Sequence, residues 1–365
     1  MPGTALIPVY AAWALMTAVA LGLVYVAIAF RVFPSFLIPL AAGMLIANLP
    51  APDLKPFLSP FLNTLQAGLD YGIYPSLIFL GLGAGMDLSY LIAHPRQLFL
   101  GLINALAFLA ILLGGTWLGL SAPLAACGAL IGGGDGLSTL FLSAHLARDL
   151  LGPAGLAAFA LVGLVPRLQP PLVRLLTTRQ ERRLHMPATR KVSRRENILF
   201  AAAGLVLTAL LIPGAMLLTG MLFLGNLIKE AGMLERLGRT LANRVAELTV
   251  VLLGLAVGTR CTYGDLVSFT FLKIIILGLA SLTLVTIIGV AAIKAANLVL
   301  TQKINPLVGA AGLGLIPDAA QMAQIMGRKE DPQNNLYYHA LASSQAGLLT
   351  VTLTAGLLWS MLAGK

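Results

Sequence analysis

The sequence predicts an all-α integral membrane protein, as its composition, its hydropathy and the length of its uncharged stretches indicate. Hydrophobic residues make up 58% of the 365 positions and charged residues only 10%, whereas soluble domains carry about 25% charged residues. The mean hydropathy is +0.90. Because a helix of about 20 apolar residues crosses a bilayer, we expect about ten spanning or half-spanning helices. The long stretches without Asp, Glu, Lys or Arg are 3–30, 32–52, 97–134, 150–166, 197–228, 274–293 and 332–364.

The first uncharged stretch predicts an N-terminal transmembrane helix within residues 1–34. Segment 11–30 has a long apolar run, and it lacks the basic region that precedes the apolar core of a secretory signal peptide. We therefore expect this helix to be retained as the first span.

Residues 174–197 predict a cytoplasmic loop. They hold eight basic residues against two acidic ones, within a chain whose net charge is +10. Short loops rich in Lys and Arg stay on the cytoplasmic side, so topology explains this charge better than binding to nucleic acid or to anionic lipid. The basic residues are Arg174, Arg179, Arg182, Arg183, Arg190, Lys191, Arg194 and Arg195.

The rest of the chain predicts two structurally repeated halves, 35–173 and 198–365. Three short motifs of the first half recur in the second at offsets of 177, 173 and 177 residues. Repeats in helical membrane proteins are typical of transporters, whose site lies between the repeats and is built from broken helices. The motif pairs are Gly43-Met44-Leu45 with Gly220-Met221-Leu222, Leu80-Gly81-Leu82 with Leu253-Gly254-Leu255, and Leu100-Gly101-Leu102 with Leu277-Gly278-Leu279.

The first half contains one broken helix, in residues 125–146 around Asp135. Four of the five residues 132–136 are glycine, and each glycine inside a helix costs about 1 kcal/mol relative to alanine. Freed carbonyls, the Asp135 carboxylate and the hydroxyls of Ser138 and Thr139 are hard oxygen ligands that suit Na⁺. We favour this role over a plain helix cap, because carboxylates inside membranes are costly and usually functional.

The second half contains the partner broken helix, in residues 304–326 around Asn305–Asp318. Glycines at 309, 312 and 314 and a proline at 317 interrupt its apolar run. Asn305 precedes a proline, so it is either a cation ligand or the cap of a helix that begins there. Asp318 is either a second carboxylate of the site or a residue at the water-facing mouth of the hairpin.

The remaining chemistry-bearing residues indicate no self-sufficient active site. The histidines lack metal-ligand spacing, so structural or interfacial roles are expected, and the cysteines suit apolar packing. Phosphate-binding, HExxH and GxSxG motifs do not occur in the sequence. These residues are His94, His145, His185, His339, Cys127 and Cys261.

Residues 132–136 are similar to a Gly-Gly-Ala-Asp-Gly-Pro-Thr segment, and residues 164–171 are similar to a Leu-Val-Pro-x-x-Gln-Pro-Pro segment. Both segments belong to the beta subunit of the sodium ion-translocating, biotin-dependent carboxylic acid decarboxylases, which this sequence resembles. That family serves oxaloacetate, methylmalonyl-CoA, glutaconyl-CoA and malonate decarboxylases. The resemblance runs from about residue 75 to the C-terminus. Further matches are 176–178, 192–196, 225–227, 305–312 and Asn334.

The resemblance implies a bacterial inner-membrane pump subunit with an elevator-type fold, a scaffold plus a mobile core, assembled as a homotrimer. It implies that carboxybiotin, supplied by a biotinylated carboxyltransferase subunit, is decarboxylated while Na⁺ moves outward. A small membrane subunit completes the complex. The chain has no Met-Lys-Met biotinylation motif, so the biotin belongs to the partner.

The resemblance also implies site residues. Asp135 is the principal cation ligand and the catalytic residue, and Asn305 and Gly309 match the family's second motif. Asp135 and Asn305 are thereby the expected Na⁺ ligands, with Gly309 beside them. Ser138, Asp318 and Ser344 are secondary candidates because of their own side-chain oxygens, and Asp318 and Ser344 stand where the family has other residues.

Several family positions are altered, and they leave alternatives open. If Asp135 and Asp318 face each other, H⁺ rather than Na⁺ is the expected ion, since neighbouring carboxylates raise one another's pKa. A stand-alone secondary carrier is a further alternative, because broken helices suit it equally. A membrane scaffold that no longer transports ions is the last alternative. The altered positions are Leu137 for Pro, Ala231 for Cys, Gly314 for Ser, Asp318 for Met, Gln321 for Arg, and Ala342-Ser343-Ser344 for Gly-Pro-Asn.

Overall fold

The computed structural model describes residues 6–232, 234–314 and 317–363, and every regular element among them is a helix. Six helical segments in these ranges are long and apolar enough to cross a bilayer, and four shorter helices are also apolar. The prediction of an all-helical membrane protein is confirmed. The long segments are α1 (Leu6–Ala29), α6 (Arg96–Trp117), α9 (Leu151–Leu176), α13 (Glu235–Thr240) continuing into α14 (Ala246–Thr259), α16 (Phe269–Val299) and α19 (Tyr337–Leu362). The shorter ones are α2 (Pro34–Ala47), α4 (Ile73–Gly85), α7 (Ala122–Ile131) and α8 (Gly136–Leu146).

The other helices are shorter or more polar. They include α3 (Lys55–Asp70), α5 (Ser89–Ala93), α10 (Arg179–Arg182), α11 (Arg194–Leu211), α12 (Met221–Glu230), α15 (Tyr263–Leu266), α17 (Leu307–Ala310) and α18 (Pro317–Glu330). Both α10 and α11 begin with a capping box, in which Thr178 or Ser193 exchanges hydrogen bonds with a glutamate three residues later. These caps explain why helix resumes at these two points of the basic loop.

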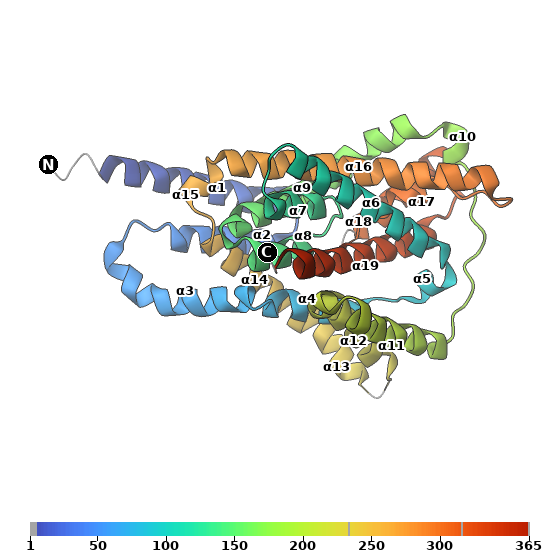
Figure 1. The fold of residues 1–365 in the computed structure, drawn as a ribbon, viewed down its shortest axis with the longest axis horizontal. Helices are drawn as coiled ribbons and strands as arrows, with labels where there is room; N and C mark the ends of the chain where they lie inside the picture. The colour runs from blue at the N-terminus through green and yellow to red at the C-terminus, as the bar shows by residue number, and fades with distance from the viewer. Residues whose placement is uncertain (1–5, 233, 315–316, 364–365) are drawn as a thin grey trace.

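The helices form an elongated molecule with α19 running through its middle (Figure 1). In that view α3, α4 and α11 to α13 lie along one side of α19, and α6, α9 and α16 lie along the other. The start of α1 lies toward one end of the long axis, and the basic loop with the end of α16 lies at the other. Among the six long segments, α19 is the most deeply buried.

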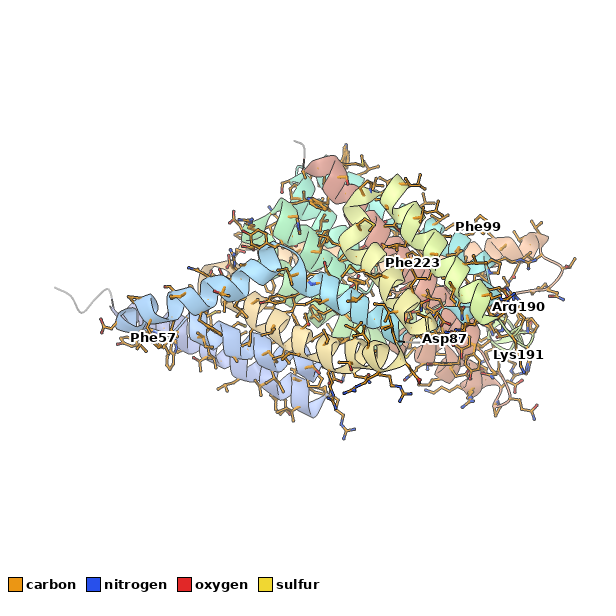
Figure 2. The ribbon with its side chains drawn as sticks, turned by 90° about the horizontal axis from the view of Figure 1, so that it is seen from below. Phe57, Asp87, Phe99, Arg190, Lys191 and Phe223 are labelled. Atoms are coloured by element: carbon orange, nitrogen blue, oxygen red, sulfur yellow. The ribbon has the colours of Figure 1, made fainter. Side chains whose placement is uncertain are left out.

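The outer surface is apolar, as a bilayer requires. Phe99 on α6 and Phe269 on α16 are 68% and 82% exposed. Figure 2 shows Phe99 at the surface and Phe57 of α3 at the opposite end of the molecule. Because lipid tails are as apolar as leucine, such side chains lose nothing by facing outward.

Glycines let the helices of the core approach closely. A methyl group added at Gly43 of α2 would overlap the carbonyl oxygen of Leu255 on α14. One added at Gly225 of α12 would overlap the carbonyl oxygen of Leu80 on α4. Small residues at such crossings allow backbones to touch, which is how membrane helices gain packing energy.

Candidate cation site

The first predicted break is present between α7 and α8. Gly132, Gly133 and Gly134 close tight turns on the last carbonyls of α7, and the helix then stops. Gly134 has a φ of +68°, a backbone conformation that glycine adopts without strain. Asp135 follows in an extended conformation and begins α8. The glycine run therefore ends one helix and turns the chain so that a carboxylate starts the next.

The Asp135 side chain is completely buried. One of its oxygens accepts a hydrogen bond of 3.0 Å from the backbone N–H of Leu137, and the other accepts from the Ser138 hydroxyl. The Thr139 hydroxyl donates to the Asp135 carbonyl at 3.2 Å. Asp135 is thus the cap of α8. The three oxygen-bearing residues predicted for this break, Asp135, Ser138 and Thr139, lie together in the structure.

The cap does not balance the charge of Asp135. Among the described residues, the ion pairs of the structure involve other carboxylates. A buried carboxylate without a cationic partner is costly, and two hydrogen bonds offset only part of that cost. Asp135 therefore requires either a proton or a bound cation, so the cap and ligand roles are compatible.

The second predicted break is also present, between α17 and α18, and it meets the first. The backbone N–H of Gly314 donates to the carbonyl of Gly133 at 2.7 Å. The Ser344 hydroxyl of α19 lies 3.0 Å from the carbonyl oxygens of both Leu313 and Gly314. The two broken helices are far apart in the chain, but their backbones meet at Gly133, two residues before Asp135.

Asn104 of α6 is a site residue that the sequence analysis missed. Its side-chain N–H donates to the carbonyl of Gly312 at 3.2 Å, while its side-chain oxygen is buried without a partner. A polar amide within the uncharged stretch 97–134 was the available signal. The partnerless oxygen is a hard acceptor on a side chain that contacts Gly312, two residues before Gly314.

Asn305 lies at the basic-loop end of the second broken helix. Its side-chain oxygen accepts from the N–H of Leu307 at 3.0 Å, which is the cap interpretation of the sequence. Its side-chain N–H groups donate to the carbonyls of Arg182 and Leu184, both at 2.9 Å. The Asn305 amide therefore fastens the basic loop to the second broken helix, and its role as a cation ligand stays a prediction.

Gly309 and Asp318 complete the predicted set. Gly309 of α17 packs against Gly289 of α16, so that a methyl group on either would overlap the backbone of the other. Asp318 is the second residue of α18, but its side chain lies outside the described part of the structure. The pairing of Asp135 with Asp318 therefore stays a prediction.

The donor set suits a monovalent cation. In the described ranges, no three His, Cys, Asp or Glu residues gather as metal ligands. One carboxylate with hydroxyl, amide and carbonyl oxygens supplies hard ligands but a single negative charge. Divalent ions such as Ca²⁺ are usually held by several carboxylates, so Na⁺ or H⁺ fits these residues better.

Comparison with known proteins gives matches over nearly the whole chain. Residues 12–362 match the family model of the Na⁺-transporting oxaloacetate decarboxylase beta subunit. The chain is 38% identical over 350 residues to the methylmalonyl-CoA decarboxylase subunit beta of Veillonella parvula, covering 96% of this chain and 93% of that protein. It is 34% identical over 353 residues to the glutaconyl-CoA decarboxylase subunit beta of Acidaminococcus fermentans, covering 96% and 94%. It is 38% identical over 299 residues to the probable oxaloacetate decarboxylase beta chain of Pasteurella multocida, covering 80% and 69%.

Proposed function

Because this chain belongs to the family of Na⁺-transporting oxaloacetate decarboxylase beta subunits, we propose that it couples decarboxylation of a biotin-bound carboxyl group to outward Na⁺ transport. The observation that supports this proposal most is Asp135, a buried carboxylate with no cationic partner among the described residues, two residues from the crossing of two broken helices. Na⁺ is the cargo, and Asp135 is its principal ligand. Moving Na⁺ against the membrane potential costs about 2.3 kcal/mol per 100 mV, which the decarboxylation supplies.

The chemistry also assigns a role to protons. When N-carboxylated biotin decarboxylates, the N–CO₂ bond breaks, CO₂ leaves and the ring nitrogen takes up one proton. Asp135 accommodates either Na⁺ or a proton, because each balances its buried charge. Ser138, Thr139 and Ser344 contribute hydroxyl oxygens, and Asn104 contributes its free amide oxygen.

We further propose that the halves 35–173 and 198–365 are repeats of an elevator-type carrier, with a scaffold and a mobile core. Reciprocal packing supports the repeat: α2 packs on α14 while α12 packs on α4, and α9 packs on α16 while α19 packs on α6. In these packed pairs Gly43 and Gly225 make equivalent contacts, so the structural register differs from the Gly43–Gly220 match of the sequence motifs. Each half also supplies one broken helix to the crossing, as repeat-built transporters do.

The proposed partners follow from the chemistry. The described chain offers oxygen ligands but no biotin attachment motif, so a biotinylated carboxyltransferase subunit supplies the carboxyl group. A small membrane subunit and two further copies of this chain complete the assembly in the bacterial inner membrane. The basic loop 174–197 faces the cytoplasm, where Lys and Arg are retained. Membership of the family does not favour the stand-alone carrier or the inactive scaffold.

Uptake of ²²Na⁺ tests the proposal. Vesicles would contain the complete decarboxylase with either the wild-type chain or Asp135→Asn, and the carboxylic acid substrate would start the reaction. We expect substrate-driven uptake with the wild type and none with Asp135→Asn. Decarboxylation without ²²Na⁺ uptake by the wild type would contradict Na⁺ transport, and unchanged uptake with Asp135→Asn would contradict the role of Asp135.

A further inference from the structure

A second polar pocket lies at the basic-loop end of the molecule, apart from the cation site. It has a volume of about 240 Å³ and lies between the start of α6, the basic loop, the segment before α17 and the start of α19. Its lining includes Arg96, Gln97, Lys303 and His339. Figure 2 shows Arg190 and Lys191 of the basic loop at this same end. We call this cavity the loop-end pocket.

The floor of the loop-end pocket carries two buried acceptors without partners. Gln97 and His339 are each 3% exposed, and the Gln97 Oε1 and His339 Nδ1 atoms have no hydrogen-bond partner. His339 Nε2 lies 2.9 Å from the carbonyl of Pro187, which only accepts, so Nε2 carries the hydrogen. In the neutral ring Nδ1 is then an acceptor. Both atoms therefore call for a ligand that donates hydrogen bonds.

The mouth of the loop-end pocket is cationic. Arg96 and Lys303 are exposed there, and no carboxylate lines the cavity. The His94 ring packs at a tilt against the His339 ring, with ring centroids 4.2 Å apart. Burial, with smaller effects from His339 and Arg190, lowers the pKa of His94 to about 4, so this ring is neutral near pH 7. The positive charge is therefore confined to the mouth, above a floor of acceptors.

We propose that the loop-end pocket binds a urea that carries a carboxylate, such as the carboxylated ureido ring of biotin. The free ureido N–H donates to a floor acceptor, while the carboxylate meets Arg96 and Lys303. The cavity of about 240 Å³ has room for a small planar group such as a ureido ring. This inference rests on the proposed function, because it places the biotin group of the partner subunit.

The position of the loop-end pocket connects it to the second broken helix. Ile304 lines the pocket and is followed by Asn305, which caps α17 and holds the carbonyls of Arg182 and Leu184. A ligand in the pocket thus touches the residue next to the cap of a broken helix. Binding in the loop-end pocket would therefore place the biotin group of the partner subunit beside the second broken helix.

Calorimetric titration of the purified full chain tests the proposal. The probe is N-carbamoylglycine, a stable urea that carries a carboxylate, and acetate and 2-imidazolidone each supply one half of it. We expect N-carbamoylglycine to bind at least about tenfold more tightly than either half, since a charged hydrogen bond contributes about 1.5–3 kcal/mol. Equal binding of acetate would mean a simple anion site and would overturn the proposal, as would no binding at all.

Variants of the loop-end pocket and matched controls localise the binding. We expect Lys303→Gln at the exposed mouth, and His339→Phe, which keeps an aromatic ring against His94, each to weaken binding about tenfold. Lys191→Gln and His185→Phe are the controls, because these residues lie on the basic loop at the same end of the molecule but do not line the pocket. Pocket variants that bind as well as the controls would overturn the assignment.

The uptake assay separates this inference from the proposed function. If Lys303→Gln and His339→Phe lose N-carbamoylglycine binding but retain full substrate-driven ²²Na⁺ uptake, the pocket does not serve the carboxyl carrier and the proposed function stands. If the wild type binds the probe but transports no Na⁺, the proposed function fails and the pocket remains a binding site.

Discussion

The crossing of the two broken helices predicts a large effect for Gly347→Ala. Gly347 lies on α19, and a methyl group there would overlap the carbonyl oxygen of Gly312. Backbone is less able to yield than a side-chain end, so overpacking costs about 1–3 kcal/mol. Displacing the segment also strains the bonds from Asn104 to Gly312 and from Gly314 to Gly133, at about 0.5–1.5 kcal/mol each. Alanine regains about 1 kcal/mol of helix propensity.

Together, these contributions lower the free energy of unfolding by about 3 kcal/mol. For a chain of 365 residues, that loss lowers the Tm by about 4 °C. Intrinsic fluorescence of the three tryptophans during heating in detergent measures it. Gly114→Ala is the matched control, because nothing lies within 4 Å of a methyl group at that position of α6. Equal Tm values for Gly347→Ala and Gly114→Ala would refute the packing of α19 against the second break.

Two further predictions concern the basic loop. Asn305→Ala removes two hydrogen bonds to the loop, although Asn334 donates to the same carbonyls of Arg182 and Leu184. We expect trypsin to cleave the loop several-fold faster in Asn305→Ala, and fastest when both asparagines are replaced. Cleavage at the wild-type rate would contradict the role of these amides in holding the loop. A hydrogen bond from Arg182 lowers the pKa of Glu330 below its ordinary 4.5. The stability that the ionised Glu330 contributes is therefore complete above about pH 4.5 and is lost as the pH falls through the lowered pKa. Intrinsic amide exchange slows toward acid in this range, so the quantity to compare is the protection factor of the loop amides. Between pH 6 and 3 it should fall toward acid in the wild type and depend less on pH in Glu330→Gln; parallel profiles would contradict this linkage.

The two breaks could be predicted from sequence because their causes are local. Glycines around Asp135 and a proline before Asp318 weaken any continuous helix wherever the chain places them. Of the two alternatives for Asn305, the hydrogen bond from the Leu307 N–H fits the cap, and the ligand role stays a prediction. Local chemistry therefore gave the positions of the broken helices and the chemical type of the ligands.

The contacts between distant segments could not be predicted from sequence. Nothing in the residues near Gly133 specifies Gly314 as its partner, because that bond depends on how α6, α16 and α19 pack. The partnerless oxygen of Asn104 is likewise visible only once its neighbours are placed. The same holds for the loop-end pocket, whose residues come from four separate parts of the chain. Short motifs identified the elements, and tertiary packing assembled the sites.

Thermal unfolding of the purified chain in NaCl and in KCl, at equal ionic strength, tests the central claim that Asp135 holds the transported Na⁺. An ion that binds only the folded state stabilises it by about 2.7 kcal/mol at a hundredfold excess over its Kd. The prediction is a higher Tm in NaCl for the wild type and the same Tm in both salts for Asp135→Asn. Equal Tm values for the wild type in the two salts, or a Na⁺-specific increase that persists in Asp135→Asn, would contradict it.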